Sequence, residues 1–309
     1  MSKLMKSLMA GALVFAVAAC SKQGPETAQA PDAGTDGGKP AIGLAVSTQS
    51  NPFFVTLKKG AEEEAQKQGL TLITVDAQDD PAKQIASIED LIQKKVKVIL
   101  VNPTDSDAVV GAVKAANAAG IPVVTLDRSV NGGEVASHVA SDNVAGGKMA
   151  AEYLLEKIGN QGDVVELEGI PGASAARERG QGFHDVIDQA KDVKVVGRQP
   201  ADFDRAKGLS VMENILQANK NVKGVFAHND EMALGAVQAL EAAGMKDVTV
   251  VGFDATDDAV NAVKAGKMSA TVAQKPELIG KTAVDAAKKI IDGQPVDKSL
   301  PVPLDLIKQ

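Results

Sequence analysis

Cysteine and histidine are scarce in this chain of 309 residues and tryptophan is missing, and the first two shortages argue against an internal disulfide and a histidine metal site. The single cysteine, Cys20, has no partner for an internal disulfide. His138, His184 and His228 lie far apart in the sequence, without the spacing of metal ligands. A formal net charge of -7 and a pI near 5.1 argue against a nucleic-acid-binding surface. Beyond residue 20, no apolar run is long enough to span a bilayer.

Motifs of common enzymes and cofactor sites are missing as well. The chain has no Gly-x-Ser-x-Gly element, and no Gly-x-Gly-x-x-Gly follows a predicted strand. Gly280-Lys281-Thr282 resembles the end of a phosphate-binding loop, but Lys275 occupies the position where that motif requires its first glycine. The acidic run that begins at Asp254 lacks the glycine and the distal glutamate of a calcium loop. We therefore expect no enzyme, no metal site and no cofactor.

The first 20 residues have the pattern of an export signal. Lys3 and Lys6 precede an apolar run, Leu8–Ala19, that is too short for a membrane span. Val17-Ala18-Ala19-Cys20 resembles a bacterial lipoprotein cleavage box, and an ordinary signal peptide with an incidental cysteine is the alternative. We expect residues 1–19 to be a signal peptide and Cys20 to become a lipidated N-terminus at a membrane surface.

Residues 20–40 have the composition of a flexible tether. From Ser21 to Pro40 the chain is rich in Gly, Pro, Ala and small polar residues, with no large apolar residue and no periodicity. Such a segment would give the folded part reach without fixing its orientation.

From Ala41 onward, apolar strands alternate with amphipathic helices. Strands are expected over Ala41–Ser47, Leu70–Val75, Val96–Val101 and Pro122–Leu126, and helices over Phe53–Gln68, Pro81–Lys95 and Asp105–Ala119. Gly69, Gly120 and Gly244 each follow a helical pattern, where a left-handed cap is favoured. Continuous β-branched runs separated by helices predict a parallel sheet covered on both faces.

The second half repeats this alternation. Its expected strands are Val135–Ala140, Val164–Glu168, Val193–Val196, Val222–Ala227 and Val248–Phe253, with a first helix over Asn143–Ile158. Asp127 and Asp254 each follow a fourth-strand-like run in their own half. We therefore predict an α/β fold of two similar doubly wound parallel-sheet domains with a cleft between them. One long sheet with a single switch point is the alternative.

Four of the apolar runs stop at side chains rich in hydrogen-bonding atoms. These side chains are Asp127 and Arg128, Asn229 and Asp230, Asp254, and Gln274. Ligands of open α/β sheets bind beyond the carboxyl ends of the strands, so these residues could converge on one place. They suit a polyhydroxyl ligand, because a hydroxyl can donate to Asp and accept from Arg or Asn. The alternative for Asp127 and Asp254 is a helix N-cap.

Aromatic residues make up only 3% of the chain, and three phenylalanines lie at loop edges. Phe53 and Phe54 follow Asn51-Pro52, and Phe203 lies between two aspartates, which is hard to explain as core. Flat rings can bury the C–H faces of a sugar. For the Phe53-Phe54 pair, packing at a helix start is the alternative.

Forked donors are available near a predicted helix start. Arg177 and Arg179 flank Glu178, so a surface ion pair is the alternative to a ligand role for either arginine. His228 lies beside the proposed cleft, where a lone histidine is usually packed or solvated.

Several long stretches, in order, resemble the periplasmic ribose-binding proteins of bacterial ABC sugar importers, over nearly all of residues 41–309. The stretches are Ser50–Phe54, Asn102–Ala108, Thr125–Arg128, Ser174–Gly180, Gln199–Arg205, Asn229–Ala233 and Val251–Asp254. The resemblance implies a type I periplasmic binding protein with two lobes, joined by a three-stranded hinge, that close on one sugar. His228 stands where the pattern has Gln, and Ala255 stands where it has Gly.

The same resemblance implies a ligand set and a division into lobes. Phe53, Phe54 and Phe203 would sandwich the sugar ring, and its hydroxyls would bond to Asn51, Asp127, Arg128, Arg177, Asn229, Asp254 and Gln274. The N-terminal lobe would comprise residues 41–141 and 275–302, and the C-terminal lobe residues 142–274 and 303–309. Hinges are expected near Ser141, Gln274 and Val302.

We therefore expect an extracytoplasmic receptor that binds D-ribose and delivers it to the permease subunits of an ABC importer. It would be a periplasmic or cell-surface lipoprotein anchored through Cys20. Alternatives are a receptor for a related sugar, such as allose or a furanose signal, and a chemotaxis subunit that contacts a chemoreceptor. A regulator of the lactose-repressor family shares this core, but the export signal stands where its helix-turn-helix would be.

Overall fold

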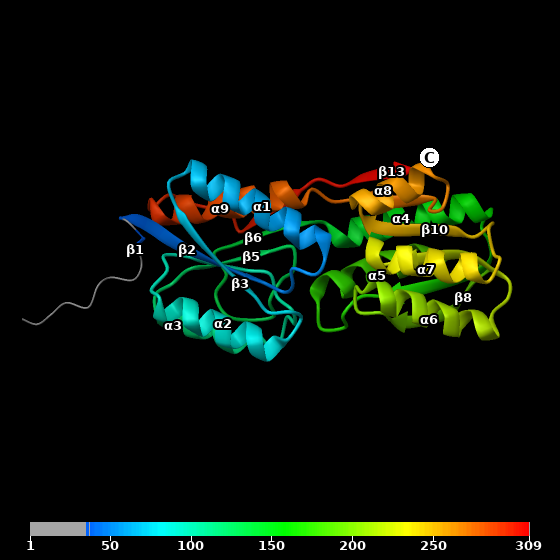
Figure 1. The fold of residues 1–309 in the computed structure, drawn as a ribbon, viewed down its shortest axis with the longest axis horizontal. Helices are drawn as coiled ribbons and strands as arrows, with labels where there is room; N and C mark the ends of the chain where they lie inside the picture. The colour runs from blue at the N-terminus through cyan, green and yellow to red at the C-terminus, as the bar shows by residue number, and fades with distance from the viewer. Residues whose placement is uncertain (1–34, 37, 309) are drawn as a thin grey trace, which may run out of the picture. The chain divides into compact units, whose positions relative to one another are not determined.

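The computed structural model describes residues 35–36 and 38–308 (Figure 1). The predicted signal peptide, Cys20 and most of the predicted tether lie outside the described residues. The end of that tether differs from the prediction: β1 (Thr35–Asp36) pairs antiparallel with the first residues of β2 (Lys39–Val46). No helix in the described part of the chain has the length and apolar character needed to cross a membrane.

The first lobe is built on a seven-stranded sheet in which all strands except β1 are parallel. The other strands, in sheet order, are β3 (Thr71–Asp76), β2, β4 (Ile99–Val101), β5 (Val123–Leu126), β6 (Ser137–Ser141) and β12 (Ser299–Val302). One face packs against α1 (Pro52–Lys67) and α9 (Pro276–Ile291), and the other against α2 (Pro81–Gln93) and α3 (Val110–Ala118).

The second lobe is built on a six-stranded sheet. In sheet order the strands are β8 (Asp192–Pro200), β7 (Gln161–Glu168), β9 (Val222–Ala227), β10 (Thr249–Asp254), β11 (Ala270–Ala273) and β13 (Asp305–Lys308), with β13 antiparallel to β11. One face carries α4 (Asn143–Ile158) and α5 (Ser174–Ile187), and the other carries α6 (Arg205–Ala218), α7 (Asp230–Ala242) and α8 (Asp257–Lys264).

The two sheets repeat one topology. Counted within each lobe, the first five parallel strands lie in the order second, first, third, fourth, fifth: β3-β2-β4-β5-β6 in the first lobe and β8-β7-β9-β10-β11 in the second. The prediction of two similar doubly wound parallel-sheet domains is confirmed, and the alternative of one long sheet is wrong.

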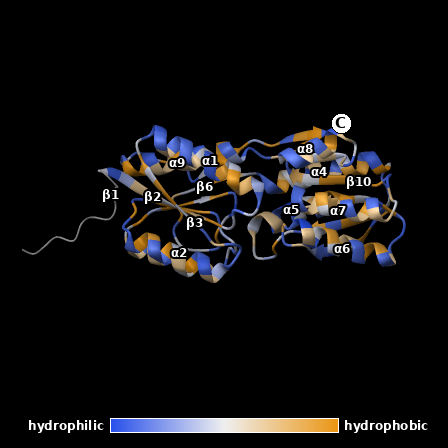
Figure 2. Cartoon of the chain, in the orientation of Figure 1, coloured by the Kyte–Doolittle hydropathy of each residue, from blue (hydrophilic) through white to orange (hydrophobic). Residues whose placement is uncertain are grey.

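The burial pattern explains why the strands are continuous apolar runs. Along β2, Ile42, Leu44 and Val46 belong to the core under α1 and α9, whereas Ala41 and Ala45 face α2 and α3. Both faces of the sheet are therefore covered, as parallel sheets require. Figure 2 shows the apolar strands inside each lobe and hydrophilic residues along the outer helices. The predicted helix caps at Gly69, Gly120 and Gly244 are confirmed, with φ of 69°, 72° and 72°.

Some element boundaries differ from the prediction. The helix expected from Asp105 begins at Val110, because the Asp105 carboxylate accepts hydrogen bonds from the N–H groups of Asp107 and Ala108 and forms a turn. The strand expected from Val96 begins at Ile99. The short edge strands β12 and β13 were not predicted.

The chain passes between the lobes three times: from β6 to α4, from β11 to α9, and from β12 to β13. Gln274 lies on the second of these passages, directly after β11. Both sheets therefore share the connecting segments at one edge.

Candidate functional site

Residues from both lobes line a small cavity where the strands end. Its lining residues are Asn51, Phe53, Phe54, Asp127, Arg128, Ala175, Arg179, Phe203, Asn229, Asp254 and Gln274. A small cavity that is shared by two lobes is a candidate site for one small molecule.

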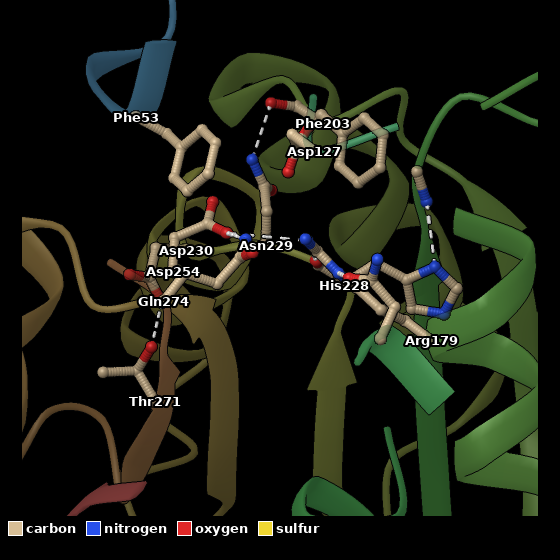
Figure 3. Close-up of polar contacts among 12 residues, drawn as sticks. Phe53, Asp127, Arg179, Phe203, His228, Asn229, Asp230, Asp254, Thr271 and Gln274 are labelled. Atoms are coloured by element: carbon tan, nitrogen blue, oxygen red, sulfur yellow. Dashed lines mark hydrogen bonds and ion pairs between the residues drawn. The ribbon is translucent and has the colours of Figure 1, made fainter. Parts of the chain in front are cut away.

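Three aromatic rings line this cavity. Phe53 and Phe54, in the first turn of α1, meet edge to face at 5.1 Å between ring centroids. Phe203 comes from the second lobe, from a residue with φ of 61°, and in Figure 3 it and Phe53 flank the polar side chains. The rings are only 3–8% exposed and also belong to the cores of their lobes. Packing at the helix start and lining of the cavity are thus both true of the Phe53-Phe54 pair.

Two carboxylates occupy equivalent strand ends. Asp127 follows β5 and Asp254 ends β10, and neither is the N-cap of a helix, so that alternative is wrong for both. Their φ angles of 62° and 116° lie in a region that non-glycine residues rarely adopt. Such strain persists only where the surroundings enforce it, and it clusters at functional sites.

Neighbouring amides hold these carboxylates in place. Asn102 Nδ2 donates to Asp127 Oδ2 at 3.0 Å, and Gln274 Nε2 donates to Asp254 Oδ1 at 2.9 Å. Asn102 was not among the predicted site residues, although it follows β4 and so obeys the same strand-end rule. Asp230 faces away from the cavity, because its carboxylate accepts hydrogen bonds from Thr271 Oγ1 and the Thr256 N–H, each at 2.7 Å.

The two asparagines of the cavity are helix N-caps. Asn51 Oδ1 accepts a hydrogen bond from the Phe53 N–H at 2.9 Å, and Asn229 Oδ1 accepts one from the Met232 N–H at 3.0 Å. Their oxygens are thus committed to the helices. Each side chain retains an amide NH₂ group as a donor, and that of Asn229 lies 3.2 Å from the Phe203 carbonyl oxygen (Figure 3).

Arg128 connects rings of the two lobes. Its guanidinium carbon lies 5.1 Å from the centroid of Phe54 and 5.0 Å from that of Phe203. Its Nη1 group donates to the Pro103 carbonyl oxygen at 3.1 Å. Burial lowers the pKa of Arg128, and the nearby Asp127 carboxylate opposes this effect.

Arg177 does not line the cavity, contrary to the prediction, and Arg179 does. Residues four apart lie on the same helical face, so Arg179 shares the face of Ala175, a lining residue of α5. Arg177 lies on the exposed side and donates to the Gly172 carbonyl oxygen at 2.9 Å. The helix α5 begins at Ser174, and the direction in which each of its residues points decides which arginine faces the cavity.

Buried partners fix the Arg179 guanidinium. Its Nε group donates to Asn143 Oδ1 at 2.9 Å, and its Nη1 group donates to the His228 carbonyl oxygen at 2.6 Å. The same Nη1 atom lies 3.5 Å from Asp254 Oδ1 (Figure 3). The close approach of α4 to α5 at Gly147, where a Cβ would lie 2.2 Å from the Arg179 carbonyl oxygen, sets the position of the helix.

Several polar atoms of the cavity find no hydrogen-bond partner among the described residues. They are Asp127 Oδ1, Arg128 Nε and Gln274 Oε1. A buried polar group left unpaired costs about 1–3 kcal/mol, so a ligand with both donors and acceptors would relieve this cost. Burial raises the pKa of Asp254 to about 7, although Arg179 acts to lower it.

Direct hydrogen bonds join the two lobes beside the cavity. The Ser106 N–H donates to the Gly172 carbonyl oxygen at 2.9 Å, and the Ser129 N–H donates to Ser174 Oγ at 2.9 Å. The lobes are therefore closed on one another. Over residues 35–36 and 38–308, no group of three or more His, Cys, Asp or Glu side chains is placed to hold a metal ion.

Comparison with known proteins identifies the class. The model of the periplasmic binding protein domain matches residues 42–295, and the chain belongs to this family. The ribose import binding protein of Bacillus subtilis (strain 168) is 54% identical over 296 residues, which cover 96% of each chain. The D-allose-binding periplasmic protein of Escherichia coli (strain K12) is 37% identical over 84% of this chain and 86% of its own.

A solved structure shows the same fold. An ABC transporter periplasmic solute binding protein from Actinobacillus succinogenes with bound D-allose superposes with a TM-score of 0.82. It is 36% identical, and the match covers 87% of this chain and 98% of that one. The family resemblance and the type I periplasmic binding protein fold predicted from the sequence are confirmed.

Proposed function

We propose that this chain is the extracytoplasmic receptor of an ABC importer and binds D-ribose in the cavity between its lobes. The observation that carries the proposal is the cavity itself, in which rings from both lobes flank carboxylates, amides and guanidinium groups. Identity supports the choice of sugar, since it is 54% with a ribose import binding protein and 37% with a D-allose-binding protein.

The side chains of the cavity match the two surfaces of a sugar. Phe53 and Phe203 would cover its C–H faces, and the unpaired atoms of Asp127, Arg128 and Gln274 would bond its hydroxyls. A sugar with one hydroxyl missing or inverted would leave a buried group unpaired. That loss amounts to about 1–3 kcal/mol and gives the site its stereochemical selectivity.

Closure would couple binding to transport. A sugar that touches both lobes stabilises the closed form only through contacts that the open form lacks. The three passages near Ser141, Gln274 and Val302 would act as the hinge, and the permease would distinguish the closed form from the open one.

Lipid attachment at Cys20 would hold the receptor at the membrane. In intact cells, Cys20→Ser should move the protein from the membrane fraction to the soluble extracytoplasmic fraction, and mass spectrometry should detect a lipid on the wild-type N-terminus. A wild-type protein without lipid would contradict the anchor. Contact with a chemoreceptor stays a prediction of the family resemblance.

A panel of D-ribose, D-allose, D-apiose and myo-inositol tests the sugar. At about 100 times its dissociation constant, the cognate ligand should add roughly 2.7 kcal/mol to the unfolding free energy, measured by thermal shift and calorimetry. We expect D-ribose to bind most tightly and to be recovered unchanged by mass spectrometry. Tighter binding of another sugar would overturn the choice of ribose, and no binding of any sugar would overturn the sugar-receptor function.

A further inference from the structure

His228 connects the cavity to the interior of the second lobe, although it does not line the cavity. It follows β9, precedes the cavity residue Asn229, and is 1% exposed. Its Nε2 atom lies 2.9 Å from Glu166 Oε1, and its Nδ1 atom accepts a hydrogen bond from the Gly169 N–H at 3.3 Å. An Nδ1 atom that accepts cannot carry a proton, so the ring is the neutral tautomer with hydrogen on Nε2.

Glu166, a residue of β7, fixes this tautomer. The carboxylate is fully buried, and its second oxygen lies 2.8 Å from His184 Nε2. Burial alone would raise the pKa of Glu166, but hydrogen bonds with His228 and His184 bring it below its ordinary value. Arg198 adds positive charge, with Nε 3.2 Å from Glu166 Oε2. The acceptor of the His228 proton is thus a carboxylate.

Gly169 carries the effect of the imidazole to an aromatic ring of the cavity. A Cβ on Gly169 would lie 2.1 Å from Phe203 Cζ and 2.2 Å from Cε1, so the Phe203 ring lies directly against this backbone. The position of the Gly169 peptide therefore limits how deeply the ring can sit. Among the described residues, the His228 imidazole is the acceptor that holds the Gly169 N–H.

The main chain of His228 reaches a second cavity residue. Its carbonyl oxygen accepts the 2.6 Å hydrogen bond from Arg179 Nη1. The His228 N–H donates to the Leu167 carbonyl oxygen at 3.0 Å, which ties this segment to β7. His228 therefore bonds both to Gly169, against which Phe203 packs, and to Arg179 itself.

We propose that the His228 imidazole is a positioning group for the sugar: it seats Phe203 through the Gly169 N–H, next to the main-chain carbonyl oxygen that holds Arg179. This inference rests on the proposed function as a sugar receptor. Glutamine at this position has an NH₂ donor group and a carbonyl acceptor, so it can make both side-chain bonds, whereas leucine can make neither.

Calorimetric titration of D-ribose into the full chain tests the role. His228→Leu should raise the dissociation constant at least tenfold, and His228→Gln should stay within threefold of the wild type. His184→Leu is the matched control: it also removes a bond to Glu166, but in the described structure His184 has no hydrogen bond to Gly169 or Arg179, so its affinity should stay within threefold. Circular dichroism confirms that each variant is folded, which separates positioning from a purely structural role.

Wild-type affinity in folded His228→Leu would overturn the inference alone, and so would an equal loss in His184→Leu. Failure of the wild type to bind D-ribose would overturn the proposed function and this inference with it. A second measurement does not depend on affinity, and it is practical because the chain has only three histidines. ¹⁵N NMR of the sugar-bound protein, with the His228 signals assigned by their loss in His228→Gln, should show the Nε2–H tautomer; an Nδ1–H ring or an imidazolium would overturn the inference.

Discussion

Replacement of Arg179 by lysine, with Arg177→Lys as the matched control, tests the assignment of the cavity most directly. Both changes keep the positive charge, and the two residues lie on opposite sides of α5. The Arg179 guanidinium bonds Asn143 and the His228 carbonyl at once and still faces Asp254 at 3.5 Å. A lysine ammonium is a compact point charge whose three N–H donors rotate together, so it cannot reproduce this planar, forked geometry.

The size of the effect follows from the sugar contact that a misplaced cation would lose. Loss of one hydrogen bond between a charged group and the sugar costs about 1.5–3 kcal/mol, which corresponds to a rise in the dissociation constant of roughly 10- to 150-fold. Arg177 is exposed, and its hydrogen bonds go to carbonyl oxygens of its own loop. Surface changes of this kind usually stay within about 0.5 kcal/mol, so Arg177→Lys should alter the affinity by less than about threefold.

Isothermal titration with D-ribose, after circular dichroism has shown that both variants are folded, gives the two dissociation constants. A larger loss of affinity in Arg177→Lys than in Arg179→Lys would refute the assignment of Arg179, and not Arg177, to the cavity. Equal and unchanged affinities would show that neither guanidinium contacts the sugar.

Three further predictions concern charge, closure and backbone strain. Because the pKa of Asp254, about 7 in the folded protein, exceeds its ordinary 3.8, the folded state retains a proton that the unfolded chain loses between these values, and stability falls as the pH rises through this window. Asp254→Asn lacks this titrating group, so from pH 4 to pH 7 its unfolding free energy should rise relative to that of the sugar-free wild type, as measured by urea titration. A difference that stays constant with pH would contradict this prediction. In Gly172→Ala, the new Cβ would lie 2.0 Å from an Asp105 carboxylate oxygen of the other lobe, so the methyl group should oppose closure. The affinity for ribose should fall by about tenfold, and the stability of the sugar-free protein should not fall. An unchanged affinity would show that closure tolerates the methyl group. Ala255 has φ of 56°, so Ala255→Gly should leave the unfolding free energy unchanged or raise it by up to about 1 kcal/mol. The control Ala115→Gly, on an exposed helical face, should lower the unfolding free energy by about 1 kcal/mol. Equal losses of stability in the two variants would refute strain at Ala255.

Much of the fold followed from alternation alone. Continuous apolar runs predict strands covered on both faces, and this signal located the principal parallel strands of both lobes. The edge strands β12 and β13 escaped it because they are short and partly exposed, and Pro301 interrupts the pattern of the first. The start of α3 was placed too early because the turn at Asp105 depends on its side-chain bonds, which composition does not reveal.

The site was predictable where a backbone rule fixes it. Asp127, Asn229, Asp254 and Gln274 follow strands, and strand ends of a doubly wound sheet meet at one edge. The choice between Arg177 and Arg179 needed the helical phase of α5. That phase depends on how α5 packs against α4 in three dimensions.

Three cavity residues, Asp127, Phe203 and Asp254, hold backbone angles that glycine would adopt at far lower cost. Glycine at these positions would raise the stability of the folded protein, but it would remove the side chains that line the cavity. Selection for robustness alone would thus erode recognition at these positions. The backbone of each residue holds its side chain in one orientation within its own lobe, so closure of the lobes has fewer side-chain conformations left to fix.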